Sequence, residues 1–132
     1  MATLVVATGR AIITNRLKGS GTEPVYVAWG TGAGTTADGN TTLFTETALD
    51  LSTTSGTRTV AGTSTQQTTT TTNDTYRVVG TLTASGAGTV TNAGLFDGNT
   101  IGSGNLFLKG DFTGIGLSSG DSIQFTFNAQ LT

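Results

Sequence analysis

Residues 122–131, SIQFTFNAQL, constrain the fold more than any other part of the sequence, because polar and apolar side chains alternate through them without a break. A period of two with one apolar face predicts a half-buried antiparallel strand. We therefore expect this segment to lie in a sheet with one side facing the core. The apolar positions are Ile123, Phe125, Phe127, Ala129 and Leu131.

A second strand is predicted just upstream, where Leu106, Leu108 and Phe112 fall on one face of an extended segment. Gly114 and a turn at residues 118–121 are expected to connect it to the last strand. Further strands are predicted at residues 75–84 and 89–96. Strands at intervals of about ten residues, with Gly turns between them, indicate a sandwich or a barrel.

The composition supports the same fold class. About a quarter of the residues are Thr, and the chain holds 20 Gly and one Pro. Thr suits a pleated sheet, and Gly in this number supplies turns and bulges, whereas residues that favour helices are scarce. We predict an all-β chain, namely an antiparallel, jelly-roll-like β-sandwich forming a single domain over residues 1–132.

Charged residues make up 11% of the chain, and the net charge is −2. This balance gives no electrostatic reason to expect nucleic acid or an anionic membrane as a partner, and a surface with few charges is easily desolvated against protein. Neither a signal peptide nor a run of membrane-spanning length is evident, so we expect a soluble protein made in the cytoplasm. The absence of Cys and His excludes disulfides, thiolate chemistry and imidazole acid–base catalysis.

Residues 1–19 are expected to form an N-terminal arm. Residues 4–6 are apolar. Thr8–Lys18 fits either a short helix, with Ile13 and Leu17 at i, i+4 spacing, Thr8 as its cap and Gly19 at its end, or a strand through residues 11–14. We favour the helix. Half of the six Lys and Arg residues fall here, and they form either an ordinary solvated face or a docking surface for an acidic partner. They are Arg10, Arg16 and Lys18.

The middle of the chain is less regular. Val25–Trp29 is apolar on both faces, which predicts an interior strand covered on each side. Gly30–Asn40 is expected to be a loop, and Thr42–Leu51 fits one helical turn or an alternating strand equally well. Arg58–Asn73 is rich in Thr and Gln and nearly devoid of apolar residues. It is an exposed edge, a projecting hairpin, a strand paired with another subunit, or a disordered segment.

The motifs that would carry chemistry fail on their spacing. The glycines at 30, 32 and 34 follow a strand, but Thr35 holds the position where a dinucleotide-binding loop needs its third Gly. Residues 97–99 and 38–40 open like calcium loops, yet Leu occupies the twelfth position in both, where a bidentate Glu is required. We predict no enzyme, no cofactor and no metal site.

Four segments in sequence carry a resemblance to a known group of proteins. They are PVYVAWGTGAGTTA (24–37), TNDTYRVVGTLTASG (72–86), TNAGLFD (91–97) and NLFLKGDFTGIGLSSGDSIQFTFNAQL (105–131). In order and spacing they resemble small virion proteins of tailed bacteriophages, closest to head decoration (cement) proteins. The resemblance implies a structural β-sandwich, often trimeric, that sits on the outer face of the capsid. It implies no catalytic residues.

The first hypothesis is therefore a non-enzymatic decoration protein on the virion that binds the major capsid protein and stabilises the shell as a homo-oligomer, with a trimer favoured. The candidates for capsid docking are Leu4, Val5, Val6, Arg10, Arg16 and Lys18. The candidates for contact between subunits are Thr65, Gln66, Gln67, Thr68, Thr70 and Thr72.

The alternative hypothesis is a tail-fibre or receptor-binding module that holds host glycan with the loops at residues 30–40 and 97–104. A glycan site usually needs an exposed aromatic ring. Trp29 and Tyr26 are the candidates beside such a loop, and both are predicted to lie in the core.

Overall fold

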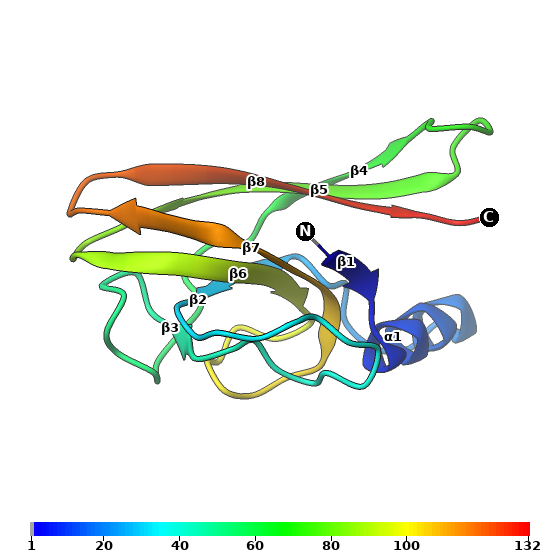
Figure 1. Ribbon diagram of the computed structural model, residues 1–132. Helices are drawn as coiled ribbons and strands as arrows, with labels where there is room; N and C mark the ends of the chain where they lie inside the picture. Colours follow the sequence, from blue (N-terminus) through cyan, green and yellow to red (C-terminus); the bar gives the residue numbers. More distant parts are fainter. Residues whose placement is uncertain (1) are drawn as a thin grey trace.

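The computed structural model describes residues 2–132, which form two antiparallel sheets and one helix (Figure 1). The five-stranded sheet has the order β1-β7-β6-β2-β3 and the three-stranded sheet the order β4-β5-β8. The prediction of an all-β, sandwich-like fold is confirmed. The elements are β1 (Ala2–Val5), α1 (Ala7–Lys18), β2 (Tyr26–Gly30), β3 (Glu46–Thr47), β4 (Thr63–Gln67), β5 (Thr75–Thr83), β6 (Gly88–Phe96), β7 (Leu106–Leu117) and β8 (Ser122–Gln130).

The main core lies between the two sheets. Trp29 and Leu95 contribute to it from the five-stranded sheet, and Val78 and Phe127 from the three-stranded sheet. Trp29 is 1% exposed, and its indole N–H donates to the Ala48 carbonyl at 3.2 Å. The interior strand predicted around Val25–Trp29 is thus β2, which pairs with β3 on one side and β6 on the other.

The outer face of the five-stranded sheet carries a second core, covered by the loop of residues 31–45. Leu43 of this loop packs with residues of the sheet that include Ala28 and Phe96. Lys109 is fully buried beneath the same loop, and its Nζ donates to Asn40 Oδ1 at 3.3 Å and to the Thr42 carbonyl at 3.0 Å. Desolvation lowers the pKa of Lys109 to about 8.

A bulge in β7 changes the predicted face of one residue. Leu108 pairs with Leu95 of β6 and Leu106 pairs with the next residue, Phe96, so Phe107 is the extra residue in β7. Because Leu95 and Phe96 point to opposite faces, Leu106 and Leu108 do as well, and the prediction that they share a face is wrong. Gly114 was also misplaced, since β7 runs through it to Leu117 and only residues 118–121 form the turn.

The helix is present and the alternative strand is not, but Thr8 does not cap it. The Thr8 hydroxyl donates instead to the Leu106 carbonyl at 2.6 Å, and Val6 occupies the N-cap position without a side-chain hydrogen bond. Gly19 ends the helix with φ of 91°, as expected of a glycine in the left-handed region. Near the other end, a Cβ atom on Gly9 would lie 2.0 Å from the Phe107 carbonyl oxygen, so the helix rests directly on the bulge.

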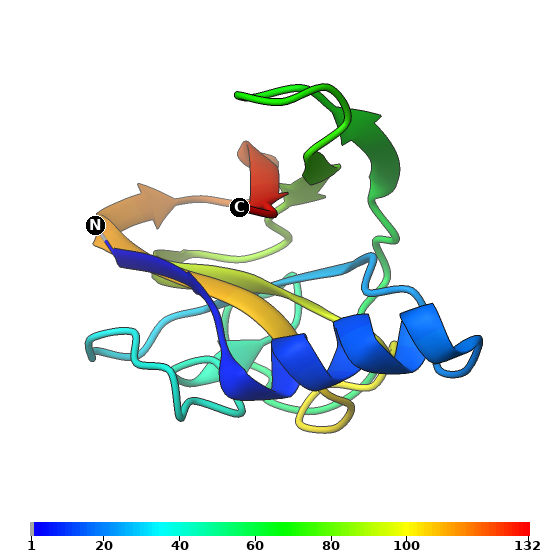
Figure 2. The ribbon, with the colours of Figure 1, turned by 90° about the vertical axis from the view of Figure 1, so that its right-hand side faces the viewer.

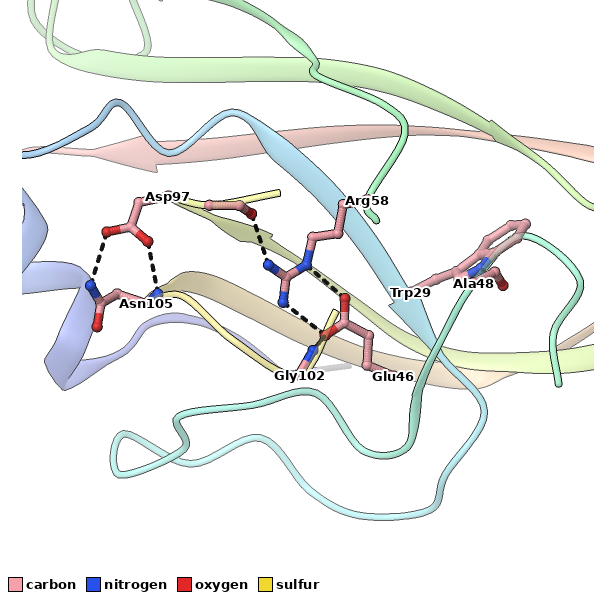
Figure 3. A network of polar contacts seen from close by, with 8 residues as sticks. Trp29, Glu46, Ala48, Arg58, Asp97, Gly102 and Asn105 are labelled. Carbon is pink, nitrogen blue, oxygen red and sulfur yellow. Dashed lines mark hydrogen bonds and ion pairs between the residues drawn. The ribbon is translucent and has the colours of Figure 1, made fainter. Parts of the chain in front are cut away.

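Neither structure expected for Thr42–Leu51 forms, apart from the two residues of β3. The segment is held by a buried ion pair between Glu46 and Arg58 (Figure 3). Arg58 donates from Nε to Glu46 Oε2 at 2.7 Å and from Nη2 to Oε1 at 2.8 Å. Its Nη1 donates to the Gly98 carbonyl at 2.8 Å, and the guanidinium lies 3.6 Å from the centre of the Phe96 ring. This pair fastens the loop after β6 to β3.

The last strand follows the prediction with one exception. β8 pairs with β5 over nine consecutive residues without a register shift. Phe127 and Ala129 are buried, whereas Ile123 and Phe125 are half-buried. Leu131 lies beyond the strand and is 64% exposed, so its expected place on the core face is wrong.

Candidate functional site

One end of the sandwich brings together three parts of the chain that are far apart in sequence (Figure 1). They are α1, the tip of the β4–β5 hairpin and the C-terminus. The basic helix and the Thr-rich segment, which the sequence assigned to two different contacts, therefore lie at the same end. Two adjoining hollows at this end share the side chains of Glu23, Tyr76 and Leu131.

The larger hollow is a groove of about 440 Å³ between α1 and the three-stranded sheet, which we call the helix groove. Ile13 and Leu17 line it from α1, and Tyr76 and Leu131 line it from the sheet side. Leu17 is 83% exposed and Leu131 is 64% exposed, the highest values among the large apolar side chains of residues 2–132. Isolated exposed Leu residues are ordinary, but two beside one apolar groove indicate a contact surface.

Tyr76 fixes the wall of the helix groove. Its ring packs edge-on against Phe107, with ring centres 5.8 Å apart. Its hydroxyl lies 3.2 Å from Glu23 Oε1 and 3.1 Å from the Pro24 carbonyl, so one proton serves two acceptors. Burial and the Glu23 carboxylate raise the pKa of Tyr76, which keeps the hydroxyl a neutral donor. The groove is therefore a formed, ordered surface.

The three predicted docking cations have different surroundings. Arg10 forms a two-pronged ion pair with Asp38, at 2.6 and 2.9 Å, in which each partner stabilises the charged form of the other. The pair raises the pKa of Arg10 and lowers that of Asp38. Arg16 lines the helix groove and donates to the Gly21 carbonyl at 2.9 Å, and Lys18 is exposed at the end of α1. Arg16 and Lys18 are thus the cations best placed for a partner.

The apolar N-terminal residues form β1 rather than a free arm. β1 pairs with β7, with Leu4 opposite Lys109 and Val5 opposite Leu108. Leu4 is 39% exposed, Val5 is half-buried, and Val6 is completely buried in the second core. Val6 has no surface to offer a partner, so its assignment to docking does not fit the structure.

The Thr-rich segment forms an exposed edge strand and a projecting hairpin (Figure 2). Both of these structures were among the predicted alternatives. β4 pairs with β5 only. Asp74 orders the hairpin tip, since its carboxylate accepts the backbone N–H groups of Thr69, Thr70 and Thr71 at 2.8, 3.0 and 3.0 Å. These bonds lower the pKa of Asp74. The disordered alternative does not hold.

The predicted subunit-contact residues fall into two groups, those whose side chains already form hydrogen bonds within the chain and those whose side chains do not. The Thr68 hydroxyl accepts from the Asn73 N–H at 3.0 Å, and the Thr70 hydroxyl accepts from the Gln130 side chain at 3.0 Å. Gln67 is half-buried and donates to Thr65 at 2.9 Å. The exposed members of the set are Thr65, Gln66, Thr68, Thr70 and Thr72. Among these exposed residues, the side chains of Gln66 and Thr72 form no hydrogen bond with another described residue, so they are the most available for a contact.

Other kinds of site are not apparent within residues 2–132. No group of three or more acidic, His or Cys side chains is arranged to hold a metal ion in this part of the chain. The described helix is too short to cross a membrane. Comparison with family models, with curated proteins and with solved structures returns no match.

The helix groove was not predicted from the sequence. Ile13 and Leu17 were noted as an i, i+4 pair, but only as support for a helix, and Leu131 was placed on the core face of the last strand. Tyr76 was assigned to a strand without a role. The sequence contains no signal for the exposure of Leu131, because Leu131 continues the alternation of the last strand and its place beyond β8 follows from the pairing of β8 with β5.

Proposed function

We propose that the chain is a bacteriophage capsid decoration protein that binds the outer surface of the shell and stabilises it without enzymatic activity. The observation that carries the proposal is the helix groove, with Leu17 and Leu131 exposed beside it and Arg16 at its side. The sequence resemblance to decoration proteins supplies the partner, the major capsid protein. The low charge of the chain, 11% of residues, supports a surface that desolvates easily against protein.

In the proposed mechanism, Leu17 and Leu131 provide most of the binding energy. Burying one Leu side chain completely contributes about 1.5–3 kcal/mol, and both are largely exposed before binding. A stable interface needs roughly 800 Å² from each partner, so the surface around the groove would have to add to the area that the two Leu side chains bury. Repeated over many copies, this burial would restrain the shell against internal pressure.

The cations add selectivity rather than most of the affinity. Arg16 and Lys18 would face an acidic patch of the shell, and such complementarity acts mainly on the association rate and on the choice of partner. Arg10 would contribute less, since Asp38 already neutralises it. Capsid binding should therefore weaken only moderately at high salt.

The proposal includes association of several copies on the capsid surface, with the trimer that the resemblance implies. The assignment of Thr65, Gln66, Gln67, Thr68, Thr70 and Thr72 to the contact between copies stays a prediction. The receptor-binding alternative is not proposed, because the aromatic ring that it would need at the loops is absent there. Trp29 is 1% exposed and Tyr26 is half-buried.

Cosedimentation with purified capsids tests the proposal. We expect Leu17→Asp and Leu131→Asp each to weaken binding by at least about ten-fold, because a charge replaces buried apolar surface. Ala11→Asp is the matched control, since Ala11 is exposed on the same helix and does not line the groove. Binding that is equal for Leu17→Asp, Leu131→Asp and Ala11→Asp would reject the groove. No binding by the unaltered protein would reject the function.

A further inference from the structure

Lys109 is a buried cation without an acidic partner among residues 2–132. It is completely buried, whereas Lys is almost never buried in proteins unless it is paired. Neither of the two ion pairs within residues 2–132 includes it. Its Nζ lies 3.1 Å from the centre of the Phe44 ring and donates to two neutral oxygens, Asn40 Oδ1 and the Thr42 carbonyl. Because an unpaired ammonium ion is costly to bury, the position of Lys109 calls for an explanation beyond packing.

The elements around Lys109 hold few charged groups. β1 and β6 contain none. The loop of residues 31–45 contains Asp38, which is already paired with Arg10 of α1, and β7 contains Asp111, which accepts the N–H of Thr36 at 2.8 Å. Desolvation outweighs the charge of Asp111 and lowers the pKa of Lys109 to about 8. Above this pKa most of the amine is an unprotonated nucleophile.

The Asn40 side chain supplies an electrophile beside this amine. Its Oδ1 lies 3.3 Å from Lys109 Nζ, and since a carbonyl bond measures about 1.23 Å, the carbon Cγ lies within about 4.5 Å of Nζ. Oδ1 also accepts the Ala37 N–H at 2.9 Å, and the Asn40 N–H donates to the Ala37 carbonyl at 3.0 Å. The turn therefore holds the amide in place, and the Ala37 N–H can stabilise the oxyanion that forms when an amine adds to Cγ.

We propose that Lys109 and Asn40 join in an isopeptide bond within the chain. The unprotonated Nζ adds to Cγ, and the bond between Cγ and the side-chain nitrogen of Asn40 breaks. The proton that Nζ gives up goes to this nitrogen, which leaves as ammonia, so the reaction needs no oxidant and no cofactor. The product replaces a buried ammonium ion with a neutral amide, and the burial of the site excludes the water that would hydrolyse it.

The bond would tie the loop of residues 31–45 covalently to β7. A cross-link between positions 40 and 109 restrains the unfolded chain, so the linked protein should melt at a higher temperature than the unlinked protein. No carboxylate of residues 2–132 contacts either side chain to relay the proton, so the bond should form slowly, and freshly purified protein should carry mainly the free amine. The reaction needs no partner, so its test is independent of capsid binding.

Mass spectrometry of the unaltered protein is the test. During incubation at about pH 9, above the pKa of Lys109, the intact mass should fall by one ammonia, about 17 Da. Trypsin cleaves after Lys and Arg but not after an acylated Lys. The unlinked chain gives separate fragments 19–58, 78–109 and 110–132, whereas the linked chain gives a branched species in which 19–58 is joined to 78–132. This species should accumulate in step with the loss of mass.

Variants separate the bond from other losses of ammonia. Lys109→Met and Asn40→Ala should each abolish the branched species, and Lys18→Met is the matched control, since Lys18 is exposed and should leave the reaction unchanged. An Asn that closes on its own backbone also loses ammonia, but this loss would persist in Lys109→Met. Two results would overturn the proposal: full mass with cleavage after Lys109 following long incubation, or an equal loss of ammonia in Lys109→Met without a branched species.

Discussion

Removing one partner of the Glu46–Arg58 ion pair should destabilise the protein strongly. Arg58 and Glu46 side chains are 1% and 7% exposed, so either one left alone would be a buried, unpaired charge. Breaking a buried pair in this way costs about 3–5 kcal/mol. Arg58 would also lose its bond to the Gly98 carbonyl and its contact with Phe96, so we place Arg58→Met at the upper end of this range.

The assays are urea denaturation and thermal denaturation, both followed by circular dichroism and applied to Arg58→Met, Glu46→Gln and the double variant. For a domain of this size, the expected loss corresponds to a fall in melting temperature of roughly 12–20 °C. The double variant should be more stable than the sum of the single losses predicts, because it leaves no uncompensated charge. A loss below about 1 kcal/mol for Arg58→Met, or strictly additive losses, would refute this account of the pair.

Three further changes follow from the same structure. Gly9→Ala should destabilise by about 1–3 kcal/mol, because its Cβ would meet the Phe107 carbonyl oxygen at 2.0 Å; Gly116→Ala, with open space around it, should cost less in the same denaturation assay. The pKa of Lys109 is lowered to about 8 in the folded protein from 10.5 in the unfolded chain. Between pH 8 and pH 10.5 the unfolded state therefore binds more protons than the folded state, so the free energy of unfolding should rise with pH in this range. Melting curves of Lys109→Met should lack that rise, and an equal rise in both proteins would contradict the assignment. Asp74→Ala should speed amide hydrogen exchange at residues 69–71, which lose their acceptor, and unchanged exchange would show that the carboxylate does not order the hairpin tip.

The parts of the fold that the sequence predicted are those set by local patterns. The alternation of residues 122–131 specified β8, because side-chain period and burial are linked along a single strand. The helix was predicted from Gly19 and from the spacing of Ile13 and Leu17, which are also local signals.

The parts that it did not predict depend on contacts between distant segments. The bulge at Phe107 arises from the register of β7 against β6 and from the close approach of Gly9, neither of which a one-strand pattern contains. The same holds for the ion pair of Glu46 and Arg58, since each residue alone looks like an ordinary surface charge.

The candidate site was predicted only in part. The cations of α1 and the Thr-rich hairpin were singled out by composition, and both lie at the end that carries the helix groove. The groove itself forms because Leu131, which follows β8, lies across the groove from α1, and this placement depends on how the sheets pack. Val6 was misassigned because an apolar run near a terminus gives no indication of whether its residues are buried.

Electron microscopy of the native particle tests the central claim most directly. We predict density for many copies on the outer face of the capsid shell, with α1, Leu17 and Leu131 against the major capsid protein. Density for a few copies at the tail, or copies on the shell with the α1 end pointing away from it, would contradict the account.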